Sequence, residues 1–179
     1  MKLEHSDEIS ANADLVYRIV KDQLPDLAPY LPSIDRIETK ERSSLPSGKE
    51  EVVSHWYAQI DMPSLLSKFI SKDLLSWKDT AVWDHEAKTV DYQLESFIAN
   101  DLFDAKGCNK FEPISDDKMK LTLSCEVHIN PDSVPGVPRL MKKKVAPLIE
   151  KIIEKMMQPN ITSLGKGLKA YLEANPGLK

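Results

Sequence analysis

The clearest pattern in the sequence is a strict alternation of apolar and polar residues over positions 118–129. Its apolar members are Met119, Leu121, Leu123, Cys125, Val127 and Ile129. A period of two places one face of a strand against a core and the other face in water. The segment therefore predicts a strand that is buried on one side.

Weaker forms of the same pattern predict six further strands. They fall at about residues 2–9, 34–42, 50–60, 74–84, 89–98 and 102–114. Turn signals separate several of them, namely Pro46-Ser47-Gly48, His85-Glu86-Ala87-Lys88 and Ser115-Asp116-Asp117. Because short turns join antiparallel neighbours, the order predicts an antiparallel meander.

Helical spacing marks the remaining segments. A helix is expected after Asn12, where apolar residues recur three and four apart, and prolines then break it into a short second turn. Pro63 begins a compact apolar helix that reaches Ile70. The longest pattern runs for about 28 residues from Val145 to Leu172, which is roughly 42 Å of helix.

These elements together predict an α+β domain. A curved antiparallel sheet of about seven strands grips one long C-terminal helix, with two short helices after the first strand and one short helix after the third. A long sheet curls with its own twist, and a single helix cannot fill its concave side. We therefore expect a cavity between the sheet and the helix.

Composition narrows the function without naming it. The chain has 179 residues, which predicts a single domain over residues 1–179. Its net charge is −4 and its pI is about 5.6, which argues against nucleic acid as a partner. The two cysteines, Cys108 and Cys125, and the four histidines are scattered, so we expect no metal, no cofactor and two free thiols.

The same survey predicts a cytoplasmic protein. The first ten residues, MKLEHSDEIS, lack the apolar stretch of a secretory signal. No window approaches the ~20 apolar residues of a transmembrane helix.

The element order, the helix Pro63–Ile70 between strands three and four, and the long final helix resemble the START-like, or helix-grip, superfamily. Met62-Pro63 and the segment from Asn160-Ile161-Thr162 to Leu172 also resemble the PRELI-type phospholipid-transfer branch, and uncharacterised bacterial START-like proteins are similar. The resemblance covers essentially the whole chain. It implies a cavity that binds a lipid or another apolar small molecule, since most members do so and a minority are cyclases, hydrolases or chaperone regulators.

Strand parity and the helical stripe predict the wall of this cavity. The expected ligand-binding residues are mostly aromatic or aliphatic: Trp56, Trp77, Trp83, Tyr92, Phe103, Asn109, Phe111, Ile149, Ile152, Ile153 and Met156. The alternative is that these side chains simply fill a solid core.

Three polar residues matter for any chemistry. By parity, Asp79 and Asn109 point inward, but a buried carboxylate is costly, so we favour a β-bulge or a position at the rim for Asp79. His55 shares its face with polar residues and is expected at the surface. Because no catalytic motif is present, catalysis is the less favoured interpretation, and a cyclase or hydrolase would need these three residues to converge.

Two surface features suggest transient contact with a membrane or with another protein. Leu65, Leu66, Phe69 and Ile70 could form a lid over the cavity, touch a membrane, dock a protein partner or merely pack on the sheet. Lys142, Lys143 and Lys144 begin the last helix and could contact anionic lipid headgroups, although a solvated helix start is the alternative.

Overall fold

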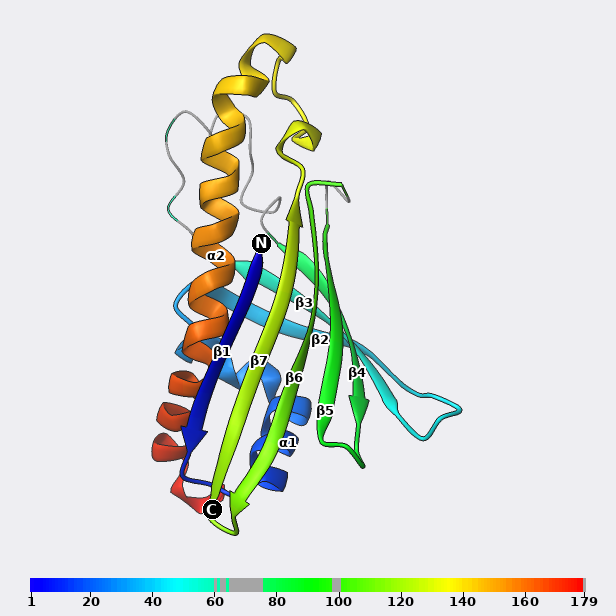
Figure 1. Cartoon of the computed structure of the whole chain (residues 1–179), viewed down its shortest axis with the longest axis vertical. Helices are drawn as coiled ribbons and strands as arrows, with labels where there is room; N and C mark the ends of the chain where they lie inside the picture. Colours follow the sequence, from blue (N-terminus) through cyan, green and yellow to red (C-terminus); the bar gives the residue numbers. More distant parts are fainter. Residues whose placement is uncertain (60, 62–63, 65–75, 98–100, 179) are drawn as a thin grey trace.

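The computed structural model describes residues 1–59, 61, 64, 76–97 and 101–178 of the chain. Within them it forms seven antiparallel strands: β1 (Lys2–Ile9), β2 (Ile34–Ser44), β3 (Glu50–Ala58), β4 (Trp77–Asp84), β5 (Thr89–Ser96), β6 (Phe103–Ser115) and β7 (Lys118–Ile129). They make one sheet in the order β1-β7-β6-β5-β4-β3-β2 (Figure 1). The predicted α+β class and antiparallel meander are confirmed.

The two short helices after the first strand and the long C-terminal helix are confirmed. In the described residues, the helices after β1 are α1 (Ala13–Asp22) and η1 (Leu24–Tyr30), and those after β7 are η3 (Pro131–Ser133), α2 (Arg139–Ala174) and η4 (Pro176–Leu178). The Asn12 side chain caps α1 by accepting hydrogen bonds from the backbone N–H groups of Asp14 and Leu15. The short helix predicted from Pro63 to Ile70 lies outside the described residues.

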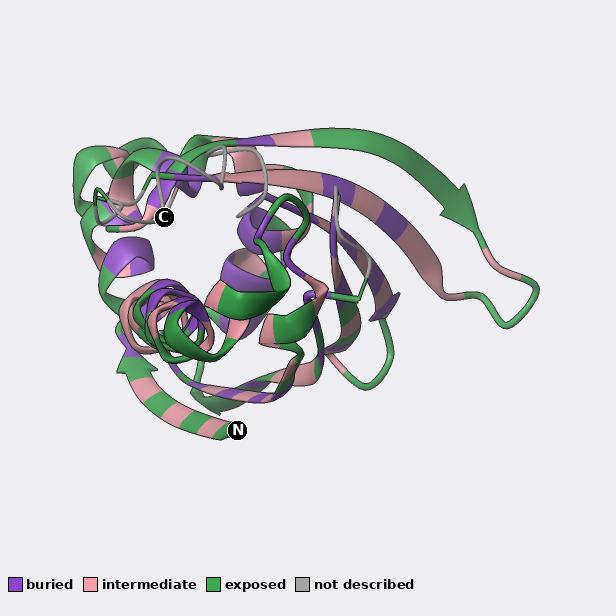
Figure 2. Ribbon diagram, turned by 90° about the horizontal axis from the view of Figure 1, so that it is seen from above, coloured by how far each residue is buried: buried purple, intermediate pink, exposed green. Residues whose placement is uncertain are grey.

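The sheet curves around the long helix. Seen from above, the strands wrap α2 while the far end of the β2–β3 hairpin projects away from the domain (Figure 2). Register shifts at Ile34/Arg36 and Thr39/Glu41 interrupt the β2–β3 ladder. Such bulges increase local twist, which helps the edge of the sheet to bend away.

Alternation in β7 produces the expected buried face. Met119, Leu121, Leu123, Cys125 and Val127 are each at most 4% exposed. The long helix α2 contributes a buried stripe of its own, made of Val145, Ile149, Ile152, Ile153, Met156, Met157, Leu168, Tyr171 and Leu172. Among the described residues, no helix is both long enough and apolar enough to cross a membrane.

Two glycines let α2 approach its neighbours closely. A β-carbon at Gly165 would overlap the carboxylate of Asp7 on β1, and one at Gly167 would lie 3.0 Å from the backbone oxygen of Tyr30 in η1. The same segment of α2 is tied to the junction of α1 and η1, because the Tyr171 hydroxyl donates to Gln23 Oε1 at 2.9 Å. The segment of α2 from Gly165 to Tyr171 is therefore clamped between β1 and η1.

Substituting Gly165 with alanine tests this clamp. In an open helix the change would stabilise by about 1 kcal/mol. Here we expect Gly165→Ala to destabilise by roughly 1–3 kcal/mol in urea unfolding, because the new methyl group overpacks against Asp7. Gly177→Ala, with no neighbouring atom near the added carbon, is the control and should change little. In an Asp7→Gly background the cost of Gly165→Ala should disappear; an undiminished cost there would contradict the clamp.

Candidate functional site

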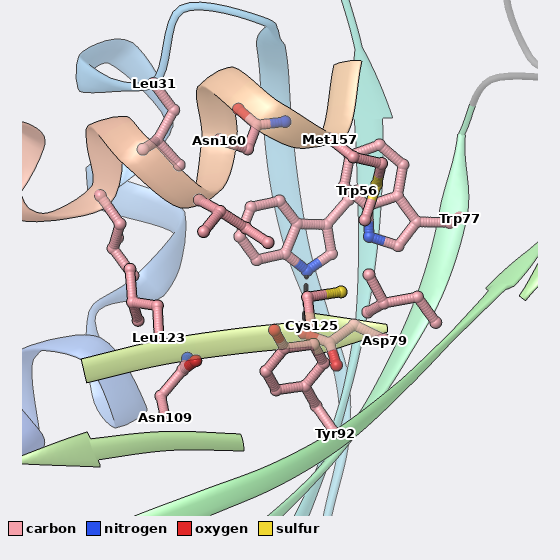
Figure 3. Close-up of a pocket in the computed structure, with 13 residues that line it drawn as sticks. Leu31, Trp56, Trp77, Asp79, Tyr92, Asn109, Leu123, Cys125, Met157 and Asn160 are labelled. Atoms are coloured by element: carbon pink, nitrogen blue, oxygen red, sulfur yellow. Dashed lines mark hydrogen bonds between the residues drawn. The ribbon is translucent and has the colours of Figure 1, made fainter. Parts of the chain in front are cut away.

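A cavity of about 110 Å³ lies between the sheet and α2. The part of α2 that borders it, from Met157 to Leu164, comes immediately before the clamped segment Gly165–Tyr171 in the sequence. Its wall comes from the loop after η1, from strands β3 to β7 and from α2 (Figure 3). The lining residues are Leu31, Trp56, Trp77, Asp79, Tyr92, Leu94, Asn109, Leu123, Cys125, Met157, Asn160, Ile161 and Leu164.

Four of the residues expected from the sequence to bind a ligand line this cavity: Trp56, Trp77, Tyr92 and Asn109. The structure places seven others in the surrounding core, buried but not among the lining residues: Trp83, Phe103, Phe111, Ile149, Ile152, Ile153 and Met156.

A separate aromatic cluster takes two of these side chains away from the cavity. Tyr17 of α1 packs edge-on against Trp83 and Phe111, with ring centroids 5.3 Å apart in both pairs. This end of the concave face is thus filled by α1, and the cavity occupies the part that α1 does not cover.

Two tryptophans form one flat side of the cavity. Trp56 and Trp77 are directly paired across β3 and β4, and their rings stack with centroids 5.6 Å apart and planes 16° apart. The Trp56 indole N–H donates to Asp79 Oδ2 at 3.2 Å. The indole ring therefore both builds the wall and holds the carboxyl group.

Asp79 lies inside and not at the rim, so our expectation of a bulge or rim position is wrong. The register runs without a shift through the pairs Ser54–Asp79 and Asp79–Leu94, and the residue is 8% exposed. Burial raises the pKa of Asp79 from 3.8 to about 7, and the Trp56 hydrogen bond offsets only part of that rise. In favouring a bulge, we did not anticipate that the Trp56 indole N–H would donate a hydrogen bond to the buried Asp79 carboxyl group.

Tyr92 on β5 is paired with Gly107 on the neighbouring strand β6. A β-carbon at Gly107 would overlap both the Tyr92 phenol and the backbone oxygen of Ser124. The missing side chain lets the Tyr92 hydroxyl donate to that same oxygen at 3.0 Å. Burial raises the pKa of the Tyr92 hydroxyl and, beside it, that of the Cys125 thiol, so neither is an easily formed anion.

Three oxygen atoms that line the cavity lack a hydrogen-bond donor. They are Asp79 Oδ1, Asn109 Oδ1 and Asn160 Oδ1, all buried and without a partner among the described residues. Figure 3 shows Asn160 on α2 and the other two on the sheet. Such groups cost free energy unless something donates to them, so their presence together marks this cavity as a site.

His55 does not join them. It lies on the other face of β3, where its ring packs on Phe97 with centroids 4.5 Å apart. It is half-buried there, and the pKa of His55 is lowered chiefly by that burial. Only Asp79 and Asn109 of the three polar candidates therefore share the cavity.

The basic residues at the start of α2 lie at the surface of the molecule. Lys143 and Lys144 are exposed, whereas the Lys142 ammonium donates to the backbone oxygen of Asp132 in η3. Leu140 beside them is 97% exposed. The proposed lid residues Leu65, Leu66, Phe69 and Ile70 lie outside the described part of the chain.

Among the described residues, no cluster of three His, Cys, Asp or Glu side chains is placed to hold a metal ion. Cys108 and Cys125 are not bonded to each other, and burial raises the pKa of Cys108 to about 11.

Comparison with known proteins shows the fold. No family model and no curated protein matches the chain. The solved structure of TTHA0849 from Thermus thermophilus is 22% identical, with a TM-score of 0.67 over 97% of this chain and 98% of that one. The Zhui aromatase/cyclase from a Streptomyces species is 16% identical, with a TM-score of 0.62 over 98% and 95%.

A third structure, a START superfamily protein from Mycobacterium smegmatis, is 17% identical, with a TM-score of 0.55 over 97% of each chain. At these identities the likeness concerns the path of the backbone. It extends over nearly the whole chain in all three cases.

Asp79 should make stability depend on pH. Its pKa is higher in the folded protein than in the unfolded chain, so the folded form holds an extra proton between about pH 4 and pH 7. The free energy of unfolding should therefore fall as pH rises through this window. The stability of Asp79→Asn relative to the wild type should therefore rise by roughly 2–3 kcal/mol between pH 5 and pH 8.

Urea unfolding at both pH values measures the effect, with the exposed turn residue Asp116 changed to asparagine as control. If Asp79→Asn destabilised the protein equally at pH 5 and pH 8, the carboxyl group would not be carrying a burial penalty.

Proposed function

Since the chain has the START-like helix-grip fold, we propose that it binds an apolar small molecule in the cavity beneath α2. The observation that carries the proposal is a largely apolar cavity among whose lining residues three have a buried oxygen without a hydrogen-bond partner. Binding sites for small molecules have this composition: an apolar wall with a few placed polar groups. A core that only stabilises the fold gains nothing from either the empty volume or the unpaired oxygens.

The size of the cavity limits the ligand. At about 110 Å³ it is comparable with engineered protein cavities of roughly 150 Å³ that take up benzene. A single-ring molecule suits this volume, whereas a lipid chain needs the cavity to enlarge. We therefore place a compact ring compound before a lipid as the ligand, and a lipid remains the finer hypothesis drawn from the resemblance.

A cyclase- or hydrolase-type reaction is the second function that the site can support. One structural neighbour is an aromatase/cyclase, and Asp79 offers a carboxyl group with a pKa of about 7 inside the cavity. A group of that pKa can give or take a proton near neutral pH. Catalysis would rest on this one residue, because His55 lies on the opposite face of β3.

Filling the cavity tests binding. Native mass spectrometry of the purified wild type should show a bound small molecule that organic extraction releases. Leu164→Trp puts an indole into the cavity and should abolish that mass shift while the fold, followed by circular dichroism, persists. Leu140→Trp makes the same change at a 97% exposed site on the same helix and should leave it intact. Equal ligand retention in both variants would contradict the proposal.

The start of α2 supports a lipid surface as a further partner. A leucine that is 97% exposed stands beside the exposed Lys143 and Lys144. Near an anionic membrane each such charge contributes about 1 kcal/mol, and a leucine can enter the interface. The lysines lie at the positive end of the helix dipole, where they do not stabilise the helix, so a role outside the fold accounts for them better.

Vesicle sedimentation tests this contact. The wild type should pellet with phosphatidylserine-containing vesicles and remain in solution with pure phosphatidylcholine vesicles. Lys143→Glu combined with Lys144→Glu should reduce the bound fraction at least fivefold at low salt, whereas Lys151→Glu combined with Lys155→Glu, farther along α2, should reduce it less. Equal losses in the two double variants would show a general effect of net charge and no specific surface at the helix start.

A further inference from the structure

Three residues of the cavity wall carry a buried side-chain atom without a hydrogen-bond partner, and each of these atoms is an oxygen. We propose that its ligand is a compact ring compound carrying O–H or N–H groups, and that the cavity rejects anions and rings without a donor. This inference rests on the proposed function and adds the chemical class of the ligand. The atoms that carry it are the unpartnered oxygens of Asp79, Asn109 and Asn160.

Two donors of the cavity wall are engaged within the protein. The indole N–H of Trp56 is committed to Asp79 Oδ2, and the hydroxyl of Tyr92 is committed to the backbone oxygen of Ser124. Asn160 Nδ2 donates to the backbone oxygen of Met156 at 2.9 Å, which leaves the amide oxygen as the atom without a partner. Donors on a ligand can complete the hydrogen bonding of the two amide oxygens and, above about pH 7, that of the ionised Asp79 carboxylate.

The charges of the lining residues also argue against an anionic ligand. None of the described residues that line the cavity is a lysine, an arginine or a histidine. A carboxylate, phosphate or sulfate would enter without a counter-charge and would face three oxygens, one of them on a carboxyl group. Anionic headgroups are thus excluded from the cavity interior, although they remain acceptable at the basic start of α2.

The flat wall explains why the donor should sit on a ring. Trp56 and Trp77 stack with planes 16° apart, and they border the carboxyl group that Trp56 holds. An aromatic ring laid against an indole gains stacking energy in an offset or edge-on arrangement. A substituent on that ring can then reach Asp79, while Asn109 and Asn160 stand on other sides of the same space (Figure 3).

Four single-ring probes distinguish the chemistries in isothermal titration of the extracted, ligand-free full chain. Phenol carries a neutral donor, benzylamine a cationic donor, toluene none, and benzoate is an anion. We expect phenol or benzylamine to bind at least tenfold more tightly than toluene and benzoate to give no heat. Preference for phenol assigns the donor to a hydroxyl group, and preference for benzylamine assigns it to an amine.

Variants tie the preference to the oxygens. Asn160→Leu keeps a good helix former in α2 and removes the acceptor, so the preference over toluene should fall at least threefold. Asn109→Leu is a second, independent removal from β6. Asn130→Leu, at an exposed position, is the matched control and should keep the preference.

The outcomes separate this inference from the proposal on which it rests. If toluene or benzoate binds as tightly as phenol and benzylamine, the donor requirement is wrong while binding in the cavity stands. Unchanged preference in both asparagine variants also overturns it. If none of the four probes binds, this inference fails, whereas the proposed function fails only if native mass spectrometry of the wild type shows no bound small molecule.

Discussion

The close approach of α2 to β1 and η1 is the constraint on which the site depends. Gly165 and Gly167 remove the side chains that would hold the helix off Asp7 and Tyr30, and Tyr171 fastens the same segment to Gln23. Because this segment is fixed, the preceding turns, which contain Met157, Asn160, Ile161 and Leu164, lie over the concave face of the sheet. One helix clamped at one end cannot also fill the width of a curved sheet, so a cavity persists under those turns.

Sequence periodicity predicted the fold well because each element depends on its own pattern. The alternation in β7 and the Asn12 cap are local facts, and a meander follows from short turns. Parity also identified the inward face of the strands. It could not say which inward residues border the cavity, because α1 reaches Trp83 and Phe111 with Tyr17 while Trp56 and Tyr92 are left uncovered.

The helical contribution could not be read from sequence for a similar reason. The apolar stripe gives the inward face of α2, but the turn that covers the cavity is set by where the two glycines seat the helix. The structure therefore places Ile149, Ile152, Ile153 and Met156 in solid core, and Met157 and Asn160 at the cavity. A glycine pair near the end of an apolar helix, Gly165-Lys166-Gly167, was the available signal for a close approach.

The inward position of Asp79 followed from parity, and only the cost of burying a carboxyl group argued against it. That cost is real, since it appears as the raised pKa, and the site retains it together with its unpaired oxygens.

The binding of a donor-bearing ring in this cavity can be seen directly in a crystal structure of the extracted protein soaked with phenol. We expect a ring in the cavity beside Trp56, with its hydroxyl oxygen within hydrogen-bond distance of at least one of the oxygens of Asp79, Asn109 and Asn160. A cavity that holds only ordered water, or that closes by side-chain movement while phenol binds elsewhere on the surface, would contradict it.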